Sequence, residues 1–597
     1  MKRSTRLFPI ACLFFMAAAY AQPVHQWEWA LRGGGTQSFF NGSSDSFAAF
    51  ERVTHISSDG NGNNYFNAVY TGGSPDVAGQ AVDHNALPDA LLVSTDCDGN
   101  LRWVKAFGSS SSVVSTGLAV DTANNAVYAT GEMNPRLNFG RLSYFDTDFI
   151  FPDNGLGRND PGPHNNFAYL IKYDLAGNFQ WVKFPQNGNQ TSNEGQQFKN
   201  REVYVDAAGN VHWLLRVGPG THLDGNLTVP AGASPFPWVV VRYDPQGNYV
   251  SHIPIDYNGS RSYLNLDFAF DSVLNRYYLL GRQEAGRTTM LDGQVITASA
   301  YLASIDAATG NTLWLEEAST DIDLVLFEMF IANDSSIYLV GGGSNTGGTP
   351  SFAGYFPDQM ASSGGTTQAQ FVVALNPDGS LKWGNNADGF SFSALAVAAN
   401  ATTVAVGSGM NTGDSWDGVF GTSGTNMSED PAVILLDAAT GAVQQVIQPR
   451  GTSSERDEVT ALGVDPNGNF IVGGYMRREL FLDPGGPATI SSNGGNEGDF
   501  WLARLATTDC SGAPLSNSTA IPQTKIKLYP NPAGKRVWLE GLAHNATVTI
   551  RDLNGRTVLT TTYKDGEPID LHNLATGVYI VTTGTAGNSV QTKLVVE

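Results

Sequence analysis

The sequence predicts an all-β protein, a seven-bladed β-propeller followed by a small β-sandwich, and three observations support the prediction. Its 597 residues include 67 Gly and 28 Pro, more than average usage, and such residues interrupt helical patterns. Short apolar runs alternate with turns rich in Asp, Asn and Gly, as in strands joined by hairpins. The same order of strands and turns returns seven times, at a spacing of about 65–75 residues, which is typical of propeller blades with insertions.

The second half of each repeat is the clearest part. An apolar strand ends at or near an Asp or Asn, a turn with Gly follows, and in most copies the next strand carries a Trp. Asp and Asn side chains cap such turns, and Gly supplies the positive φ that they need. The strands are residues 91–96, 169–174, 239–244, 301–306, 371–376, 433–437 and 500–505.

The first half of each repeat gives the same count. A turn built on Asp or Asn precedes an apolar strand in each copy, and the turns begin near Asp59, Asp121, Asp206, Asp271, Asn333, Asn400 and Asp465. Each repeat therefore supplies four strands, with a variable insert between the second and the third.

One strand stands apart from the repeats. Residues 27–34 resemble the fourth strand of a repeat, such as residues 101–108, whereas the seventh repeat has no fourth strand. We expect Trp27 and Trp29 to lie beside residues 500–505, so that the N-terminal strand closes the ring and removes an exposed sheet edge.

These motifs resemble those of the secreted bacterial seven-bladed β-propeller repeat family. The likeness covers residues 22–510 and is best at residues 166–181 and from Asp499 onward. Residues 306–314 also resemble a quinoprotein-type repeat. The resemblance implies the fold and says little about function.

The N-terminus has the pattern of an export signal. Three basic residues precede the apolar stretch 7–19, and an A-x-A site ends at Ala21. We expect residues 1–21 to be a signal peptide that is cleaved after Ala21. Lipidation of Cys12, in the apolar stretch, is the alternative. No later segment is long and apolar enough to predict a membrane span.

The C-terminal segment 525–597 follows a linker, residues 511–524, rich in Ser, Thr, Ala and Pro. Its motifs resemble those of the type A sorting domain of type IX secretion (the Por system) in Bacteroidetes. The resemblance implies a small β-sandwich that engages the secretion machinery and is then removed, leaving the body released or attached to the cell surface. The motif residues are Tyr529, Pro530, Asn531, Pro532, Asp552, Gly555, Arg556, Gly577, Val578 and Tyr579.

Charge and motifs exclude several functions. The net charge is −22, and the acidic excess lies before residue 525, so nucleic-acid binding is excluded. Nucleophile, zinc-protease, P-loop and dinucleotide motifs are absent, and the nine His residues lack ligand spacing, so no catalytic residue, cofactor or metal is predicted. Asp-rich turns such as residues 96–100 suit calcium, but hairpin turns explain them better.

The insert at residues 132–164 is the candidate ligand loop. It contains Tyr144, Asp146, Asp148 and Asp153. Aromatic faces beside carboxylates suit a carbohydrate or a cation, and loops on a rigid scaffold often bind ligands. The alternative is an ordinary solvated insertion.

Cys97 and Cys510 are the two cysteines that remain after signal cleavage, and they occupy equivalent turns of the first and last repeats. An oxidising export route permits a disulfide between them. Equivalent turns on neighbouring blades diverge toward the rim, however, and a disulfide needs Cα atoms within about 7 Å. We therefore expect two free thiols, with the disulfide as the alternative.

Three functions fit this sequence to different degrees. The favoured one is a secreted or surface propeller that binds a glycan, protein or peptide without catalysis. The alternative is a hydrolase or lyase acting on an extracellular polymer, with acidic residues at the central funnel. A quinone-dependent dehydrogenase is disfavoured, because the Trp motif is irregular and there is no adjacent Cys pair.

Overall fold

The computed structural model is all-β in the part of the chain that it describes, apart from one short 3-10 helix, η3 (Leu223–Gly225). It divides into two compact units, Met1–Pro514 (unit 1) and Leu515–Glu597 (unit 2). None of its helices is long and apolar enough to cross a membrane, within the residues described. The described residues are 24–36, 51–71, 73–83, 89–108, 113–133, 144–145, 149–150, 167–185, 199–233, 236–259, 266–283, 288–319, 323–344, 351–355, 368–388, 395–411, 414–421, 430–453, 456–493, 498–513, 515, 527–540, 547–552, 556–564, 567–585 and 588–597.

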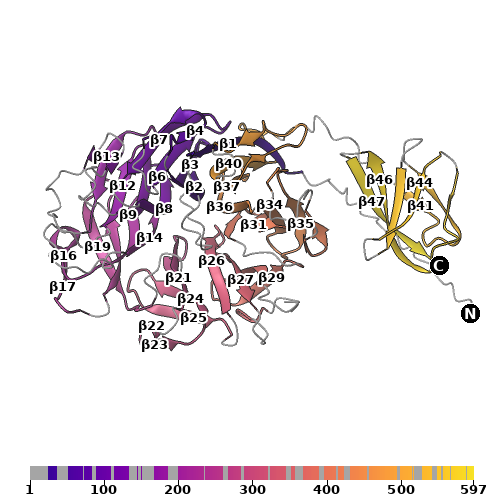
Figure 1. Cartoon of the computed structure of the whole chain (residues 1–597). Helices are drawn as coiled ribbons and strands as arrows, with labels where there is room; N and C mark the ends of the chain where they lie inside the picture. Colours follow the sequence, from indigo (N-terminus) through magenta and orange to yellow (C-terminus); the bar gives the residue numbers. More distant parts are fainter. Residues whose placement is uncertain are drawn as a thin grey trace, which may run out of the picture. The chain divides into compact units, whose positions relative to one another are not determined.

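The described part of unit 1 contains seven antiparallel arrays of four strands, called sheets one to seven here in chain order (Figure 1). Sheets one and seven each continue into a two-stranded insert and are then six-stranded. Their first strands are β2 (Arg52–Ser58), β8 (Val113–Asp121), β14 (Lys199–Val205), β20 (Leu266–Asp271), β26 (Asp323–Ile331), β30 (Ala396–Ala399) and β36 (Glu458–Val464). The second strands are β3 (Asn64–Tyr70), β9 (Ala126–Met133), β15 (Val211–Arg216), β21 (Arg276–Arg282), β27 (Ile337–Ser344), β31 (Thr403–Met410) and β37 (Phe470–Met476).

The outer half of each sheet follows the same order. The third strands are β6 (Asp89–Thr95), β12 (Phe167–Tyr173), β18 (Trp238–Tyr243), β24 (Ala300–Asp306), β28 (Gln368–Leu375), β34 (Asp430–Asp437) and β40 (Asp499–Ala506). The fourth strands are β7 (Leu101–Gly108), β13 (Phe179–Lys183), β19 (Tyr249–Ile255), β25 (Thr312–Glu317), β29 (Leu381–Asn386), β35 (Val443–Ile447) and, in sheet seven, β1 (Gln26–Gly34).

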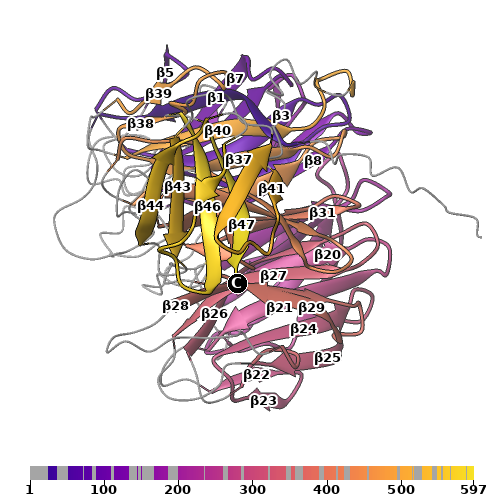
Figure 2. The same cartoon turned by 90° about the vertical axis from the view of Figure 1, so that its right-hand side faces the viewer.

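The first strands of successive sheets contact one another in chain order, and the first strand of sheet seven, β36, contacts that of sheet one, β2. In Figures 1 and 2 the indigo strand β1 lies beside the orange strand β40. Apolar cores fill the spaces between neighbouring sheets; one such core joins Phe66 and Leu91 of sheet one to Phe500 of sheet seven.

The N-terminal strand completes sheet seven, as the sequence predicted. Strand β1 pairs antiparallel with β40, from Gln26 opposite Ala506 to Gly33 opposite Phe500. Arg504 of β40 is fully buried and forms ion pairs with Glu28 of β1 and, at 2.8 Å, with Asp465. A buried cation between two carboxylates ties the strand to its sheet.

A Trp on the fourth strand connects most sheets to the next. Trp29 Nε1 of sheet seven donates a hydrogen bond of 2.7 Å to the carbonyl oxygen of Cys97 in sheet one. The indole also packs against Gly99, where a Cβ would lie 2.5 Å from the ring and where φ is +83°, so only Gly fits this turn. The same contact recurs from Trp103, Trp181, Trp314 and Trp383 to the carbonyl oxygens of Leu175, Pro245, Pro377 and Ala438.

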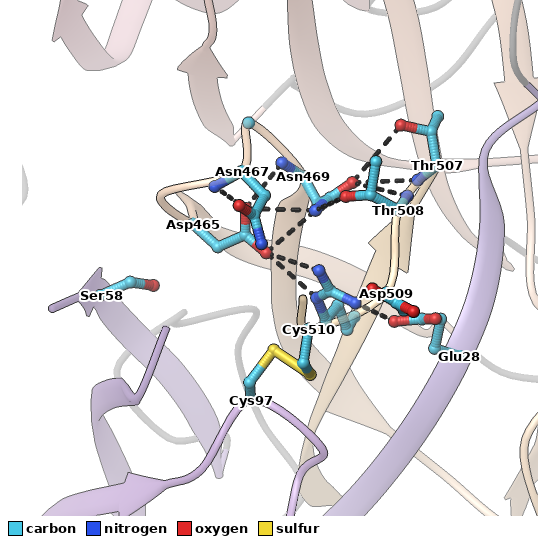
Figure 3. Close-up of polar contacts among 12 residues, drawn as sticks. Glu28, Ser58, Cys97, Asp465, Asn467, Asn469, Thr507, Thr508, Asp509 and Cys510 are labelled. Atoms are coloured by element: carbon cyan, nitrogen blue, oxygen red, sulfur yellow. Dashed lines mark hydrogen bonds and ion pairs between the residues drawn. A yellow bond between two sulfur atoms is a disulfide. The ribbon is translucent and has the colours of Figure 1, made fainter. Parts of the chain in front are cut away.

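Cys97 and Cys510 form a disulfide, with Cα atoms 5.8 Å apart, so the expectation of two free thiols was wrong (Figure 3). That expectation took the two turns to keep the ordinary spacing of neighbouring repeats. In sheet seven, however, the fourth strand is β1 and not the segment that follows β40, and the Asn469 side chain accepts hydrogen bonds from the amides of Thr507 and Thr508. The segment before Cys510 is thereby held to the first turn of sheet seven, and the disulfide joins it to sheet one.

The inserts between second and third strands connect each sheet to the preceding one, and we call these inserts clasps. In each sheet a backbone contact joins the insert either to the end of the fourth strand of the preceding sheet or to the residues shortly after that strand. Most inserts are hairpins: β4 (Asp76–Val77) with β5 (Gln80–Ala81), β10 (Tyr144–Phe145) with β11 (Phe149–Ile150), β16 (Gly220–His222) with β17 (Leu227–Val229), β22 (Thr289–Leu291) with β23 (Gln294–Ile296), β32 (Ser415–Trp416) with β33 (Val419–Phe420), and β38 (Glu479–Leu480) with β39 (Ile490–Ser491).

Unit 2 contains two sheets that share one apolar core, to which Val537, Ile550, Val581 and Leu594 contribute. The alternation of buried and exposed residues along Thr547–Asp552 is that of a strand with one buried face. The strands are β41 (Lys527–Tyr529), β42 (Arg536–Glu540), β43 (Thr547–Asp552), β44 (Thr557–Thr562), β45 (Ile569–Asp570), β46 (Gly577–Thr585) and β47 (Asn588–Val596).

Candidate functional site

A cavity of about 610 Å³ lies where the first strands of the seven sheets meet. All seven first strands contribute to its lining, which makes it a feature of the whole of unit 1 rather than of one loop. Much of the lining is apolar and includes Ile56, Leu118, Val205, Phe330 and Leu462. The polar and charged side chains of the lining include Arg52, Thr54, His55, Glu202, Tyr204, Asp267, Glu328 and Thr460.

Irregular strand pairing places several of these side chains. The pairing of five first strands with their second strands shifts by one residue, which leaves Thr54, Thr116, Glu202, Phe327 and Thr460 at the shifts. A β-bulge of this kind breaks the alternation of the strand and re-aims the side chain. All of these residues except Thr116 line the cavity.

His55 joins two sheets that are not neighbours. Its Nε2 lies 3.0 Å from Glu202 Oε1 of sheet three, and its Nδ1 lies 3.0 Å from Thr54 Oγ1. Thr460 Oγ1 of sheet seven donates a hydrogen bond of 2.7 Å to the carbonyl oxygen of Val53 in sheet one. Polar side chains therefore hold the first strands in fixed positions around the cavity.

The carboxylates of sheets three, four and five lie on the cavity lining. Asp267 Oδ2 accepts a hydrogen bond of 3.0 Å from the amide of Met329, so it connects sheets four and five. Desolvation raises the pKa of Glu328 well above its ordinary value, and the negative charges of Asp267 and Glu202 raise it further. The amide of Val397 opposes these effects through a hydrogen bond.

Tyr204 lies among these carboxylates. Its hydroxyl donates a hydrogen bond of 3.0 Å to the carbonyl oxygen of Phe268. Burial raises the pKa of Tyr204 well above its usual range, and the charges of Glu202, Asp267 and Glu328 add to the effect. The arrangement offers negative charge and an aromatic ring to whatever enters the cavity. No group of three or more His, Cys, Asp or Glu in the described parts of the chain is placed to hold a metal ion.

The candidate ligand loop is described only in part. The backbone of Tyr144 pairs with Gly108 of β7, so this end of the insert is a clasp on sheet one rather than a free loop. Asp146, Asp148 and Asp153 lie outside the described residues, and so does Ala21 at the expected cleavage site.

The first sorting motif, residues 529–532, forms hydrogen bonds with β47, the last strand of unit 2. The Asn531 side chain donates to the carbonyl oxygen of Lys593 and accepts from the amide of Val595, each at 2.8 Å. Tyr529 is exposed and stacks on Trp538, with ring centroids 6.4 Å apart. The peptide bonds before Pro530 and Pro532 are cis.

The other sorting motifs also contribute to local structure. Asp552, at the end of β43, accepts a hydrogen bond of 3.0 Å from the amide of Arg556 and pairs with its guanidinium at 3.1 Å. Tyr579, which follows Gly577 and Val578 on β46, donates from its hydroxyl to the carbonyl oxygen of Ala575 at 2.7 Å. Gly555 lies outside the described residues.

Sequence reasoning missed the cavity residues. His55 and Glu202 are 147 positions apart, and no local motif links them. The available signal was a charged residue between apolar neighbours in a first strand, as at Asp267 and Glu328. Glu202 lies at a shift in the strand pairing and Glu328 lies next to one, and a strict alternation of faces does not anticipate where such residues point.

The family model described as "Secretion system C-terminal sorting domain" matches residues 527–597. The sorting domain indicates export by type IX secretion to the cell surface or outside the cell. It also implies an interaction with the type IX machinery. No curated protein matches the chain.

Several solved structures are similar to the chain at low identity. PorZ, described as an essential bacterial surface component of the type IX secretion system of Porphyromonas gingivalis, has 12% identity and a TM-score of 0.22, with 92% of this chain and 82% of that chain covered. Quinohemoprotein alcohol dehydrogenase from Comamonas testosteroni has 12% identity and a TM-score of 0.33, with 81% and 76% covered. A protein of unknown function from Dyadobacter fermentans has 11% identity and a TM-score of 0.35, with 81% and 100% covered. Because these TM-scores are low, the similarities do not indicate a function.

Proposed function

We propose that this chain is an exported seven-bladed β-propeller that binds a ligand in its central cavity without catalysing a reaction. The succession of seven four-stranded sheets and the contact of β36 with β2 support the propeller. The pairing of β1 with β40 supports its closure by the N-terminal strand. Residues 525–597 are the segment that carries the body to the surface, after loss of residues 1–21, with residues 511–524 as the linker.

The observation that carries the binding function is the cavity itself. Its volume of about 610 Å³ lies within the range of small-molecule sites, and its lining combines apolar walls with a few fixed polar groups. The polar groups are held by contacts between sheets, so they are pre-organised for a ligand.

The test is a binding screen with the purified secreted protein against glycan and peptide arrays. Ser57→Trp is expected to fill the cavity, because Ser57 lines it. The matched control is Ser272→Trp, at an exposed turn between β20 and β21. Binding that is lost in Ser57→Trp and kept in Ser272→Trp supports the proposal, whereas a ligand that binds both variants equally places the site elsewhere.

One observation favours a second candidate function, the hydrolysis of an extracellular polymer. Glu202 and Glu328 share one cavity, and Glu328 has a raised pKa, as a general acid requires. Release of reducing sugars from bacterial or plant polysaccharides, abolished by Glu328→Gln, would establish this activity. Substrates that bind without turnover would exclude it for those polymers.

A further inference from the structure

Two buried carboxyl groups meet at the seam, the junction of sheets seven and one. Asp499 is the first residue of β40 in sheet seven, and Glu51 directly precedes β2 in sheet one. A Cβ built on Gly34 of β1 would lie 2.9 Å from Asp499 Oδ1 and closer still to Glu51 Oε2, so these two oxygens face one small space. Asp499 is fully buried, and Glu51 is 2% exposed.

Both oxygens of Glu51 receive hydrogen bonds. Its Oε1 accepts from the amide of Thr71, at 2.8 Å, and from the Thr71 hydroxyl. Its Oε2 accepts one hydrogen bond of 2.9 Å, from the amide of Gly35. Because a carboxylate offers about four acceptor positions, two on each oxygen, Oε2 keeps one position for a proton that displaces no other donor.

Asp499 lacks a donor at one oxygen. Its Oδ2 accepts hydrogen bonds from the amide of Asn493 at 2.7 Å and from the Arg32 guanidinium at 3.2 Å. Its Oδ1 has no hydrogen-bond partner within the described residues. A buried oxygen without a partner is costly, and two adjacent carboxylates repel each other. One proton between Asp499 Oδ1 and Glu51 Oε2 removes both costs.

The charges around the pair favour retention of a proton. Arg32 divides its guanidinium between Asp499 and Asp76, so one positive charge faces two carboxylates. Burial raises the pKa of Glu51 well above its ordinary value, and the charge of Asp499 adds to the effect. Burial also raises the pKa of Asp499, to about 7, and the charge of Asp76 adds to that.

Two other basic residues lie close to the pair along the chain or in a neighbouring strand. Arg52 follows Glu51 and lines the central cavity. Arg477 follows β37, the strand next to β40, and its amide donates to Asp457. Neither side chain is among the main causes of the two pKa shifts, so neither takes the place of the proton.

We propose that Glu51 and Asp499 hold one proton between them and that this proton makes the seam sensitive to pH. The proposal goes beyond the proposed function, because it needs no ligand. An open seam exposes both groups to water, where carboxyl groups ionise above about pH 4. Opening therefore releases the proton between about pH 4 and pH 7, so the seam is tightest in acid and loosens as the pH rises.

The experiment is hydrogen–deuterium exchange on the purified secreted protein, read at β1 and corrected for the intrinsic exchange rate at each pH. Release of one proton predicts that the opening equilibrium of β1 rises about tenfold between pH 5 and pH 6 and changes little above pH 7. Strand β13 is the internal control, because it is the fourth strand of sheet two and lies at another junction. It should show no such rise.

Asp499→Asn tests the source of the pH dependence. Its amide nitrogen can donate to Glu51 from the position of Oδ1 at every pH, so the corrected exchange of β1 should be equal at pH 5 and pH 6. Asp76→Asn is the matched control, since it makes the same substitution at the other carboxylate that contacts Arg32. It should keep the tenfold rise. Thermal unfolding of each variant checks that it is folded.

The remaining outcomes overturn the proposal. Exchange of wild-type β1 that does not depend on pH does so without any variant, and it decides the matter if Asp499→Asn does not fold. A tenfold rise that persists in Asp499→Asn, or that is also lost in Asp76→Asn, assigns the effect to other groups. A hundredfold rise means that each carboxyl holds a proton of its own. An equal rise in β13 belongs to the whole of unit 1 rather than to the seam.

Discussion

Asp499 is a fully buried carboxyl at the seam between sheets seven and one. Burial raises its pKa to about 7, the nearby Asp76 carboxylate adds to this, and the amide of Asn493 and the Arg32 guanidinium oppose it. The folded protein thus holds this proton more tightly than an unfolded chain does, whose Asp pKa is about 3.9. The contribution of Asp499 to stability is fully present below pH 4 and falls as the pH rises to about 7.

Asp499→Asn should therefore reduce the loss of thermal stability between pH 4 and pH 7, because Asn cannot ionise. The measurement is the unfolding temperature by circular dichroism at one-unit pH steps. Asp378→Asn is the matched control: Asp378 is exposed, and hydrogen bonds from Ser380 lower its pKa, so its effect lies at more acidic pH. If the unfolding temperature of Asp499→Asn falls between pH 4 and pH 7 as steeply as that of the wild type, Asp499 is not the group whose ionisation destabilises the protein.

At the scale of elements, the N-terminal strand and the Trp contacts explain how sheets are joined. Trp29→Ala removes a hydrogen bond to Cys97 and the packing on Gly99. Because the side chain is only half-buried, we expect a loss of about 2–3 kcal/mol in the free energy of unfolding, below the value for a full core Trp. Urea titration measures it.

Trp103→Ala is the matched control for Trp29→Ala. It removes the equivalent contact between sheets one and two, where the chain is continuous through both sheets. We expect a similar loss of stability from both variants, but faster reduction of the Cys97–Cys510 disulfide only in Trp29→Ala. Equal reduction rates in the two variants would show that β1 does not shield the seam.

The sequence could predict the third and fourth strands because the same residue types have the same structural role in successive repeats. Asp caps the turn, Gly takes the positive φ, and Trp contacts the next turn, so the pattern recurs at each copy. The clasps could not be predicted in the same way, since strands of two or three residues have no periodicity of their own. The cavity depends on bulges and on contacts between distant repeats, which a local pattern does not encode.

At the scale of the whole molecule, the Cys97–Cys510 disulfide spans 413 positions and connects the two ends of unit 1. A chain-entropy estimate for so long a loop gives on the order of 5 kcal/mol. We expect Cys97→Ser, Cys510→Ser and the double variant to lose the same amount of free energy of unfolding. Reductant should lower the free energy of unfolding of the wild type and leave that of the three variants unchanged. Unfolding with and without reductant measures this, and two titratable thiols in the unreduced wild type would rule the bridge out.

The sorting domain should be separable from the body. Each apolar core of the described chain consists of residues from one unit only: the unit 2 core runs from Ala533 to Val596, and no unit 1 core includes any of it. Deleting residues 525–597 therefore removes no core residue from unit 1, and the truncated body should unfold at the wild-type temperature of that unit. It should also remain in the periplasm, since the segment that the type IX machinery takes is gone. Cell fractionation with a circular dichroism melt of the trapped protein tests both halves. A folded body at the cell surface in normal amounts would show that export does not depend on this domain. A truncated body that does not fold would show instead that unit 1 needs unit 2 for its stability.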